Sequence, residues 1–291
     1  MGSSWRPDHG GVHNRGMHRS AFPDGELRFL VHINHNRSTM NDTGNHNRNS
    51  KYADPASIRT GFYSAVLTAA LTLITFGFAL TAVPISGAFC PDNCIEYPYL
   101  NTASQYPGDY LWMLFAMLMI LAYMVLMVSI HATVSRDKHI FSLAGLAFAT
   151  TATVILLSDY FIQFSVIPVS LTYGETDGIP LLIQYNAHGI FIALEDLGYL
   201  VMGLSFLSMA PVFSGKNRLE TAIRWIFLIS FLLALISLIW ISARYGTDRR
   251  DRLEVAVLSI DWMVLIINGI LLSRWFRRRL KRGTAERMDG S

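Results

Sequence analysis

Three acidic side chains interrupt long apolar stretches of this sequence, where charged groups are costly inside a bilayer and usually serve a function. Asp159, Glu195 and Asp261 lie in three different stretches. At 1.5 Å per helical residue, each lies about 10–13 Å from the predicted outer end of its stretch. Because the sequence places no lysine or arginine at that depth, these carboxyl groups are suited to exchanging protons or binding a cation.

Helical periodicity groups further polar residues with these acids. Residues three, four or seven apart share a helical face, so His188 and Tyr199 fall on the face of Glu195. Polar faces of neighbouring membrane helices turn toward one another. We therefore predict a polar chamber that opens toward the outside and is lined by Asp159, Gln163, His188, Glu195, Tyr199, Asp261 and Asn268.

Two more acids lie close to this set. Asp196 is about a quarter turn from Glu195, so we expect it at the edge of the site. Glu254 begins a stripe of seven-residue spacing that continues through Asp261 and Asn268. In the predicted chamber the acids in the third and fourth stretches exchange protons, the histidine passes protons at the entrance, and Asp261 pairs with a cation.

Two other interpretations of these polar residues remain open. They could form interhelical hydrogen bonds that only hold the bundle together. Alternatively, His188 with three nearby acids could hold a divalent metal, although one histidine is weak support for zinc. The sequence contains no phosphate-binding glycine loop, nucleophile elbow, zinc-protease motif or dinucleotide fingerprint, and Ser158 is the single candidate nucleophile near the acids. We therefore expect neither enzymatic activity nor a cofactor or metal.

The composition explains which elements position these residues. Hydrophobic residues make up 52% of the 291 residues and charged residues only 15%, which is unlike a soluble globular protein. Uninterrupted apolar blocks of this length predict membrane helices, since a bilayer leaves the backbone no other hydrogen-bond partners. We predict an all-α protein with six transmembrane helices at about 60–83, 110–132, 140–166, 187–211, 219–243 and 253–275.

The distribution of lysine and arginine predicts the orientation. Basic residues are frequent before Arg59, in the second and fourth loops and after Arg274, and are missing from the first and third loops. Cytoplasmic loops are the ones enriched in such residues, so both termini are expected in the cytoplasm. The fifth loop, with Arg244, Arg249 and two further arginines, contradicts this pattern in part. The net charge of +3 reflects this topology, and we expect no nucleic-acid partner.

The segments outside the six spans are polar. Residues 1–57 are rich in Asn, His, Arg, Gly and Ser and are predicted to be a disordered tail, and residues 277–291 a basic cytoplasmic tail. The first loop contains the only cysteines, Cys90 and Cys94, which we predict to form a local disulfide on an oxidising side of the membrane. A redox-active pair or a zinc site is less consistent with this spacing.

The first span has a face of small and hydroxylated residues, which lets helices approach closely in lipid. We predict that this face packs inward. Its members are Ser64, Ala65, Thr68, Ala69, Thr72, Thr75 and Gly77.

Three runs, YPGDYLWM at 106–113, DYFIQFSV at 159–166 and QYNAHGIFIALEDLGY at 184–199, resemble those of an uncharacterised family of six-helix bacterial membrane proteins. The likeness covers roughly residues 58–280 and implies the architecture and a bacterial plasma membrane, without an activity. Together with the predicted acidic chamber, this architecture leads us to expect a transporter that couples the movement of protons or a cation to that of a small solute. A non-catalytic sensor or assembly partner is the alternative, and a membrane-embedded metal-dependent enzyme is the third possibility.

Overall fold

The structure is a computed structural model, and it describes residues 54–215 and 217–289. The predicted amino-terminal tail, residues 1–57, lies outside this range except for residues 54–57, and the first described helix begins there at Pro55. The side chain of Asp54 starts this helix by accepting a hydrogen bond from the backbone N–H of Ala56 at 3.3 Å. Proline fits the first helical position because it has no N–H to satisfy.

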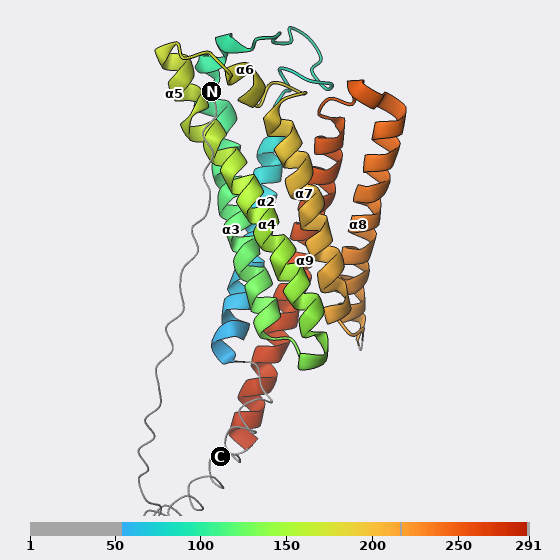
Figure 1. The fold of residues 1–291 in the computed structure, drawn as a ribbon. Coiled ribbons are helices and arrows are strands. Elements are labelled where there is room, and N and C mark those ends of the chain that lie inside the picture. Colours follow the sequence, from blue (N-terminus) through green and yellow to red (C-terminus); the bar gives the residue numbers. More distant parts are fainter. Residues whose placement is uncertain (1–53, 216, 290–291) are drawn as a thin grey trace, which may run out of the picture. The chain divides into compact units, whose positions relative to one another are not determined.

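Six long helices run roughly alongside one another, and shorter ones connect them (Figure 1). Each long helix is apolar and long enough to cross a membrane, which confirms the predicted all-α, six-span architecture. The long helices are α2 (Pro55–Thr81), α3 (Leu111–Ala132), α4 (His139–Ser165), α7 (Ile190–Met209), α8 (Arg218–Tyr245) and α9 (Arg252–Asp289). The short helices are α5 (Ile167–Tyr173), α6 (Ile179–Leu182), η1 (Leu100–Gln105), η2 (Gly108–Tyr110), η3 (Arg136–Lys138), η4 (Ala210–Val212) and η5 (Gly246–Asp248).

The order of packing around the bundle is α2, α3, α4, α7, α8 and α9, and α9 closes the ring against α2. Helix α7 also touches α9. We call the end with residues 82–110, 166–189 and 246–251 the disulfide end. The end with residues 133–138, 210–215 and the last turns of α9 is the basic end (Figure 1).

Helix α9 is longer than the sequence predicted. It continues to Asp289 through the segment expected to be a basic tail, residues 277–291. Arginine, leucine, lysine and alanine are good helix formers, and the single Gly283 costs only about 1 kcal/mol in a helix interior. Loss of hydrophobicity ends the apolar span but does not end the helix.

The hydroxylated face of α2 packs inward against α9 and α3 as predicted, with Thr68, Thr72 and Thr75 fully buried. Gly77 is the exception, because it is exposed. The backbones of α2 and α9 approach closely at Gly269, where an added Cβ would lie 2.8 Å from the Cβ of Ala69 and 3.0 Å from the carbonyl oxygen of Ala65. The two backbones therefore meet where both side chains are minimal.

Replacing Gly269 with alanine is expected to lower stability, because neither backbone can move away without disturbing the rest of the interface. The cost of such overpacking is about 1–3 kcal/mol. The measurement is the apparent melting temperature in detergent, followed by far-ultraviolet circular dichroism. Gly77→Ala is the control, since nothing lies within 4 Å of a Cβ there. Equal melting temperatures for the two variants would contradict the close contact.

Candidate functional site

Four carboxyl groups gather between α4, α7 and α9 near the disulfide end, and we call Asp159, Glu195, Asp196 and Glu254 the acid cluster. The carboxyl groups of Glu195 and Glu254 lie within hydrogen-bonding reach of each other. Glu195 also interacts electrostatically with Asp159 and Asp196. The first three acids are no more than 5% exposed, and Glu254 is partly buried.

The closeness of the Glu195 and Glu254 carboxyl groups has a direct chemical consequence. An ionised carboxylate only accepts hydrogen bonds, so a bond between two carboxyl groups requires a proton on one of them. Helices α7 and α9 both begin at the disulfide end and touch each other, which brings the second turn of α7 beside the first turn of α9. A hydrogen bond within this pair would therefore need one of the two glutamates to be protonated.

Three aromatic side chains fix the position of Glu195. Tyr160 Oη on α4 donates to Glu195 Oε1 at 2.5 Å and lies 2.8 Å from Tyr199 Oη. Trp262 Nε1 on α9 donates to the same Tyr199 oxygen at 3.0 Å. All three aromatic residues are at most 1% exposed. This chain of hydrogen bonds connects α4, α7 and α9 across the bundle interior.

Several buried oxygens near this network have no hydrogen-bond partner among the described residues. They are one carboxyl oxygen each of Asp159 and Asp196, both carboxyl oxygens of Asp261, and the amide oxygen of Asn268. Buried polar groups in proteins are almost always paired, and an unpaired one costs about 1–3 kcal/mol, or more when charged. Because these oxygens make no hydrogen bonds, a role in holding the helices together does not explain why they are buried.

Asp196 has a partner that the sequence did not predict. Arg249, in the connection between α8 and α9, places Nη2 3.2 Å from Asp196 Oδ2, and the Asp196 side chain is only 7% exposed. The sequence places no lysine or arginine at the depth of Asp159, Glu195 and Asp261, and Arg249 reaches the peripheral Asp196 from outside the helices. The connection folds back over the bundle and brings an arginine from the fifth loop onto α7.

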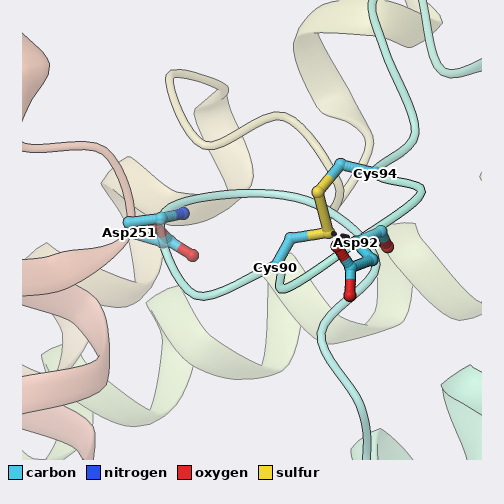
Figure 2. Close-up of a disulfide and its surroundings, with 5 residues drawn as sticks. Cys90, Asp92, Cys94 and Asp251 are labelled. Carbon is cyan, nitrogen blue, oxygen red and sulfur yellow. Dashed lines mark hydrogen bonds between the residues drawn. A yellow bond between two sulfur atoms is a disulfide. The ribbon is translucent and has the colours of Figure 1, made fainter.

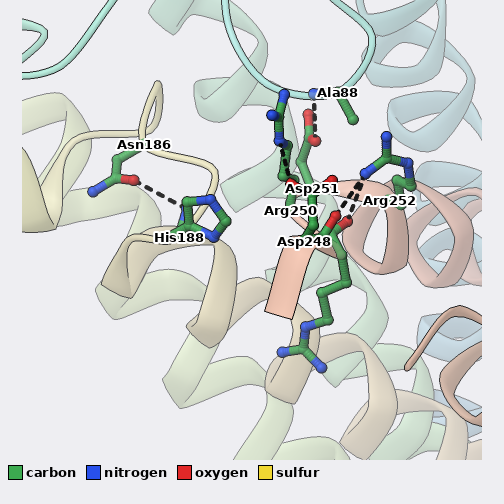
Figure 3. A network of polar contacts seen from close by, with 8 residues as sticks. Ala88, Asn186, His188, Asp248, Arg250, Asp251 and Arg252 are labelled. Carbon is green, nitrogen blue, oxygen red and sulfur yellow. Dashed lines mark hydrogen bonds and ion pairs between the residues drawn. The ribbon is translucent and has the colours of Figure 1, made fainter. Parts of the chain in front are cut away.

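The same connection is attached to the first loop (Figure 3). Asp251 Oδ1 accepts a hydrogen bond from the backbone N–H of Ala88 at 2.8 Å. Gly87 has a φ of +81°, and a Cβ there would lie 2.1 Å from Asp251 Oδ2. Only glycine permits this approach, since it tolerates positive φ and has no side chain.

The predicted disulfide between Cys90 and Cys94 is present, with an S–S distance of 2.08 Å. Cys90 lies two residues beyond Ala88, and Figure 2 shows Asp251 next to the part of the first loop that leads into the disulfide. The disulfide thus restrains the segment that holds the α8–α9 connection over α7.

Gln163 anchors the segment before α7. Its Nε2 donates to the carbonyl of Leu182, and its Oε1 accepts from the backbone N–H of Gln184 at 3.0 Å. In the same segment Tyr185 Oη donates to Asp109 Oδ2 at 3.1 Å. Burial raises the pKa of Tyr185 above its ordinary value, so it remains a donor. These contacts hold residues 179–189 across the disulfide end.

His188 is placed differently from the prediction. It lies before α7, which begins at Ile190, and its side chain is exposed. Its backbone N–H donates to Asn186 Oδ1 at 3.0 Å (Figure 3). The expectation that His188 shares a helical face with Glu195 and Tyr199 is wrong, because the apolar window included residues of the preceding loop.

The predicted open chamber is closed in this structure. Its predicted lining residues other than His188 are at most 2% exposed. Asn268 lies about two turns from Asp261, and its Nδ2 donates to the carbonyl of Ile223 at 3.5 Å, so it is not part of the acid cluster. Within residues 54–215 and 217–289, no group of three or more His, Cys, Asp or Glu residues is arranged to hold a metal ion.

Three residues of the network were missed by sequence reasoning: Tyr160, Arg249 and Trp262. Glu254 was recognised on the stripe that contains Asp261 but was not included in the predicted lining. Tyr160 and Trp262 each follow one of the predicted acids directly, but helical periodicity assigns adjacent residues to different sectors. Arg249 had no local signal.

The six apolar helices define the chain as a multi-pass membrane protein. Comparison with family models, curated proteins and solved structures finds no match. The resemblance to a bacterial six-helix family is therefore supported only as far as the architecture.

Proposed function

We propose that this protein couples proton movement to the transport of a small solute across a bacterial plasma membrane, with the acid cluster as the proton-exchange site. The pair of Glu195 and Glu254 carries the proposal, because two carboxyl groups within hydrogen-bonding reach inside a membrane bundle can share a proton. Intramembrane ionisable residues commonly mark proton or substrate pathways. The closed arrangement described above is one state of the proposed cycle.

Protons suit this site better than metal cations. A bound cation requires several oxygens converging on one point, and the described residues offer no such group of acids. A hydrogen bond within the pair of glutamates instead requires a proton. Asp159 lies near enough to Glu195 to interact with it electrostatically, so a change of charge on one alters proton binding by the other.

The proposal places the disulfide end outside and both termini in the cytoplasm. Exposed Arg274, Arg277 and Arg278 lie at the basic end, consistent with a cytoplasmic surface, and a disulfide suits the oxidising side. Two of the fifth-loop arginines that oppose this orientation are engaged in ion pairs, Arg249 with Asp196 and Arg250 with Asp248. Their charges are thereby partly offset.

Replacing Glu195 with glutamine is expected to lower proton flux at least tenfold, because the amide cannot exchange the proton. Purified protein in liposomes with an internal pH-sensitive dye, driven by a potassium diffusion potential, measures the flux. Infrared difference spectra across a pH titration should show a protonated-carboxyl band that this variant loses. Glu175→Gln, at an exposed glutamate of the disulfide end, is the matched control.

The same experiment tests the alternative, a sensor or assembly partner whose polar core is structural. The hydrogen bonds among Tyr160, Tyr199 and Trp262 favour that alternative, since they connect helices without needing a titrating group. Wild-type protein that conducts no protons and shows no band dependent on Glu195, together with lower stability of Glu195→Gln, would replace the transport proposal with it.

A further inference from the structure

Polar groups continue from the acid cluster toward the basic end, and the next of them is Asp261. It lies on α9 about two turns beyond Glu254, is fully buried, and neither of its carboxyl oxygens has a hydrogen-bond partner among the described residues. A structural carboxyl group would be paired in such a place. Asp261 therefore has two oxygens available for transient hydrogen bonds.

Asp261 acts electrostatically on the hydroxyls of two tyrosines from different helices, Tyr199 on α7 and Tyr123 on α3, without a hydrogen bond to either. Tyr199 belongs to the hydrogen-bonded chain that begins at Glu195, through Tyr160. Asp261 thus lies between the acid cluster and the hydroxyl of Tyr123 on α3, a helix that contributes no residue to the cluster.

The other helices packed against α9 bring no charge to this level. The only charged residue of α2 is Arg59, in its second turn, and the charged residues of α8 lie near its two ends. Toward Asp261 the inward face of α2 contributes hydroxyls, and Thr72 Oγ1 and Thr75 Oγ1 donate to carbonyls of their own helix. Nothing described there would fix Asp261 as a permanent ion pair.

Beyond Asp261 the polar groups lead further along the bundle. The buried hydroxyl of Tyr123 makes no hydrogen bond within the described part of the chain but lies near that of Ser205, whose Oγ donates to the carbonyl of Gly145 at 2.8 Å. One helical turn closer to the basic end, Ser142 Oγ lies 2.9 Å from His131 Nδ1. Histidine is the side chain best suited to exchange protons with water near neutral pH.

We infer that Asp261 is a proton carrier that connects the acid cluster with the basic end through Tyr199 on one side and Tyr123 on the other. This inference rests on the proposed function. The transfer starts with Asp261 protonated and is one concerted shift. Asp261 gives the proton on one oxygen to Tyr123 Oη, whose own proton passes toward Ser205, while its other oxygen takes the proton of Tyr199 Oη. Tyr199 regains a proton from Tyr160, and Tyr160 regains one from protonated Glu195, which reverses the hydrogen bond between Tyr160 and Glu195. Only O–H bonds form and break, and one proton moves in total.

The test measures proton flux in the same liposomes for Asp261→Asn and Tyr123→Phe. Both variants are expected to lower the flux at least tenfold and to retain the infrared band that depends on Glu195. Tyr123→Phe is nearly isosteric, so it carries the test if the asparagine variant fails to fold. Tyr63→Phe is the control, because Tyr63 is 63% exposed on α2.

The outcomes separate the two proposals. Flux that Glu195→Gln abolishes but Tyr123→Phe leaves at the wild-type rate would overturn the carrier role of Asp261 and leave the proposed function standing. Wild-type flux in Glu195→Gln would overturn the proposed function and the carrier role together. Loss of flux in Glu195→Gln, Asp261→Asn and Tyr123→Phe, with normal flux in Tyr63→Phe, supports both.

Discussion

Trp262→Ala is expected to cost about 3–5 kcal/mol, the usual range for removing a buried tryptophan side chain, and to leave little folded protein at the growth temperature. Trp262 is 1% exposed, and its ring packs against Phe76, Trp112 and Tyr199 with centroid distances of 5.7, 6.4 and 6.5 Å. The substitution also removes the hydrogen bond that its indole N–H donates to Tyr199 Oη. It therefore loosens the contacts of α9 with α2, α3 and α7 together.

The yield of folded protein in detergent and the apparent melting temperature, from far-ultraviolet circular dichroism, measure this effect. Trp240→Ala is the matched control, because Trp240 is 61% exposed on the lipid side of α8 and its removal should change stability by only about 0.5 kcal/mol. If both tryptophan variants unfolded at the same temperature, Trp262 would not be the shared packing centre described above.

Arg249→Gln is expected to destabilise the protein by about 1–3 kcal/mol, because it leaves a buried carboxyl group of Asp196 without its charged partner. The range is below that for a fully buried pair, since the Arg249 side chain is 39% exposed while that of Asp196 is 7% exposed. The other carboxyl oxygen of Asp196 has no partner in the described part of the chain, so it cannot compensate. Thermal unfolding in detergent measures the change.

Two variants make this prediction specific. Arg250→Gln breaks an ion pair with Asp248 in which both side chains are largely exposed, so it should cost less than about 1 kcal/mol. Adding Asp196→Asn to Arg249→Gln should restore part of the lost stability, because a neutral amide needs no cation. A double variant less stable than Arg249→Gln alone would show that the ion pair is not the source of the effect.

The positions of the membrane helices could be predicted from the sequence because an apolar block carries its own signal. Helix α3, for example, was expected at about 110–132 and spans Leu111–Ala132. The apolar block misplaces the ends of a helix where the helix and the block do not coincide. Helix α9 continues through arginines that favour helix without favouring lipid, and the block that predicted α7 began in a loop, which misplaced His188.

The candidate site was predictable only in part, for a different reason. Periodicity identifies which residues of one helix share a face, so the burial of Asp159, Glu195 and Asp261 followed from it. It does not say which residues of different helices touch. The contact of Arg249 with Asp196 joins residues that are 53 apart in sequence, and it depends on how the α8–α9 connection folds back.

The position of the contact between Gly269 and Ala69 relates movements at the two ends of α9 to each other. It lies near the middle of the 38-residue helix. At 1.5 Å per residue, Glu254 in the acid cluster is about 22 Å from it in one direction, and Arg282 at the basic end is about 20 Å from it in the other. If α9 tilted as a rigid helix about this contact, its two ends would move by similar distances in opposite directions. A movement of its first turn at the acid cluster would be matched by an opposite movement of its last turns at the basic end.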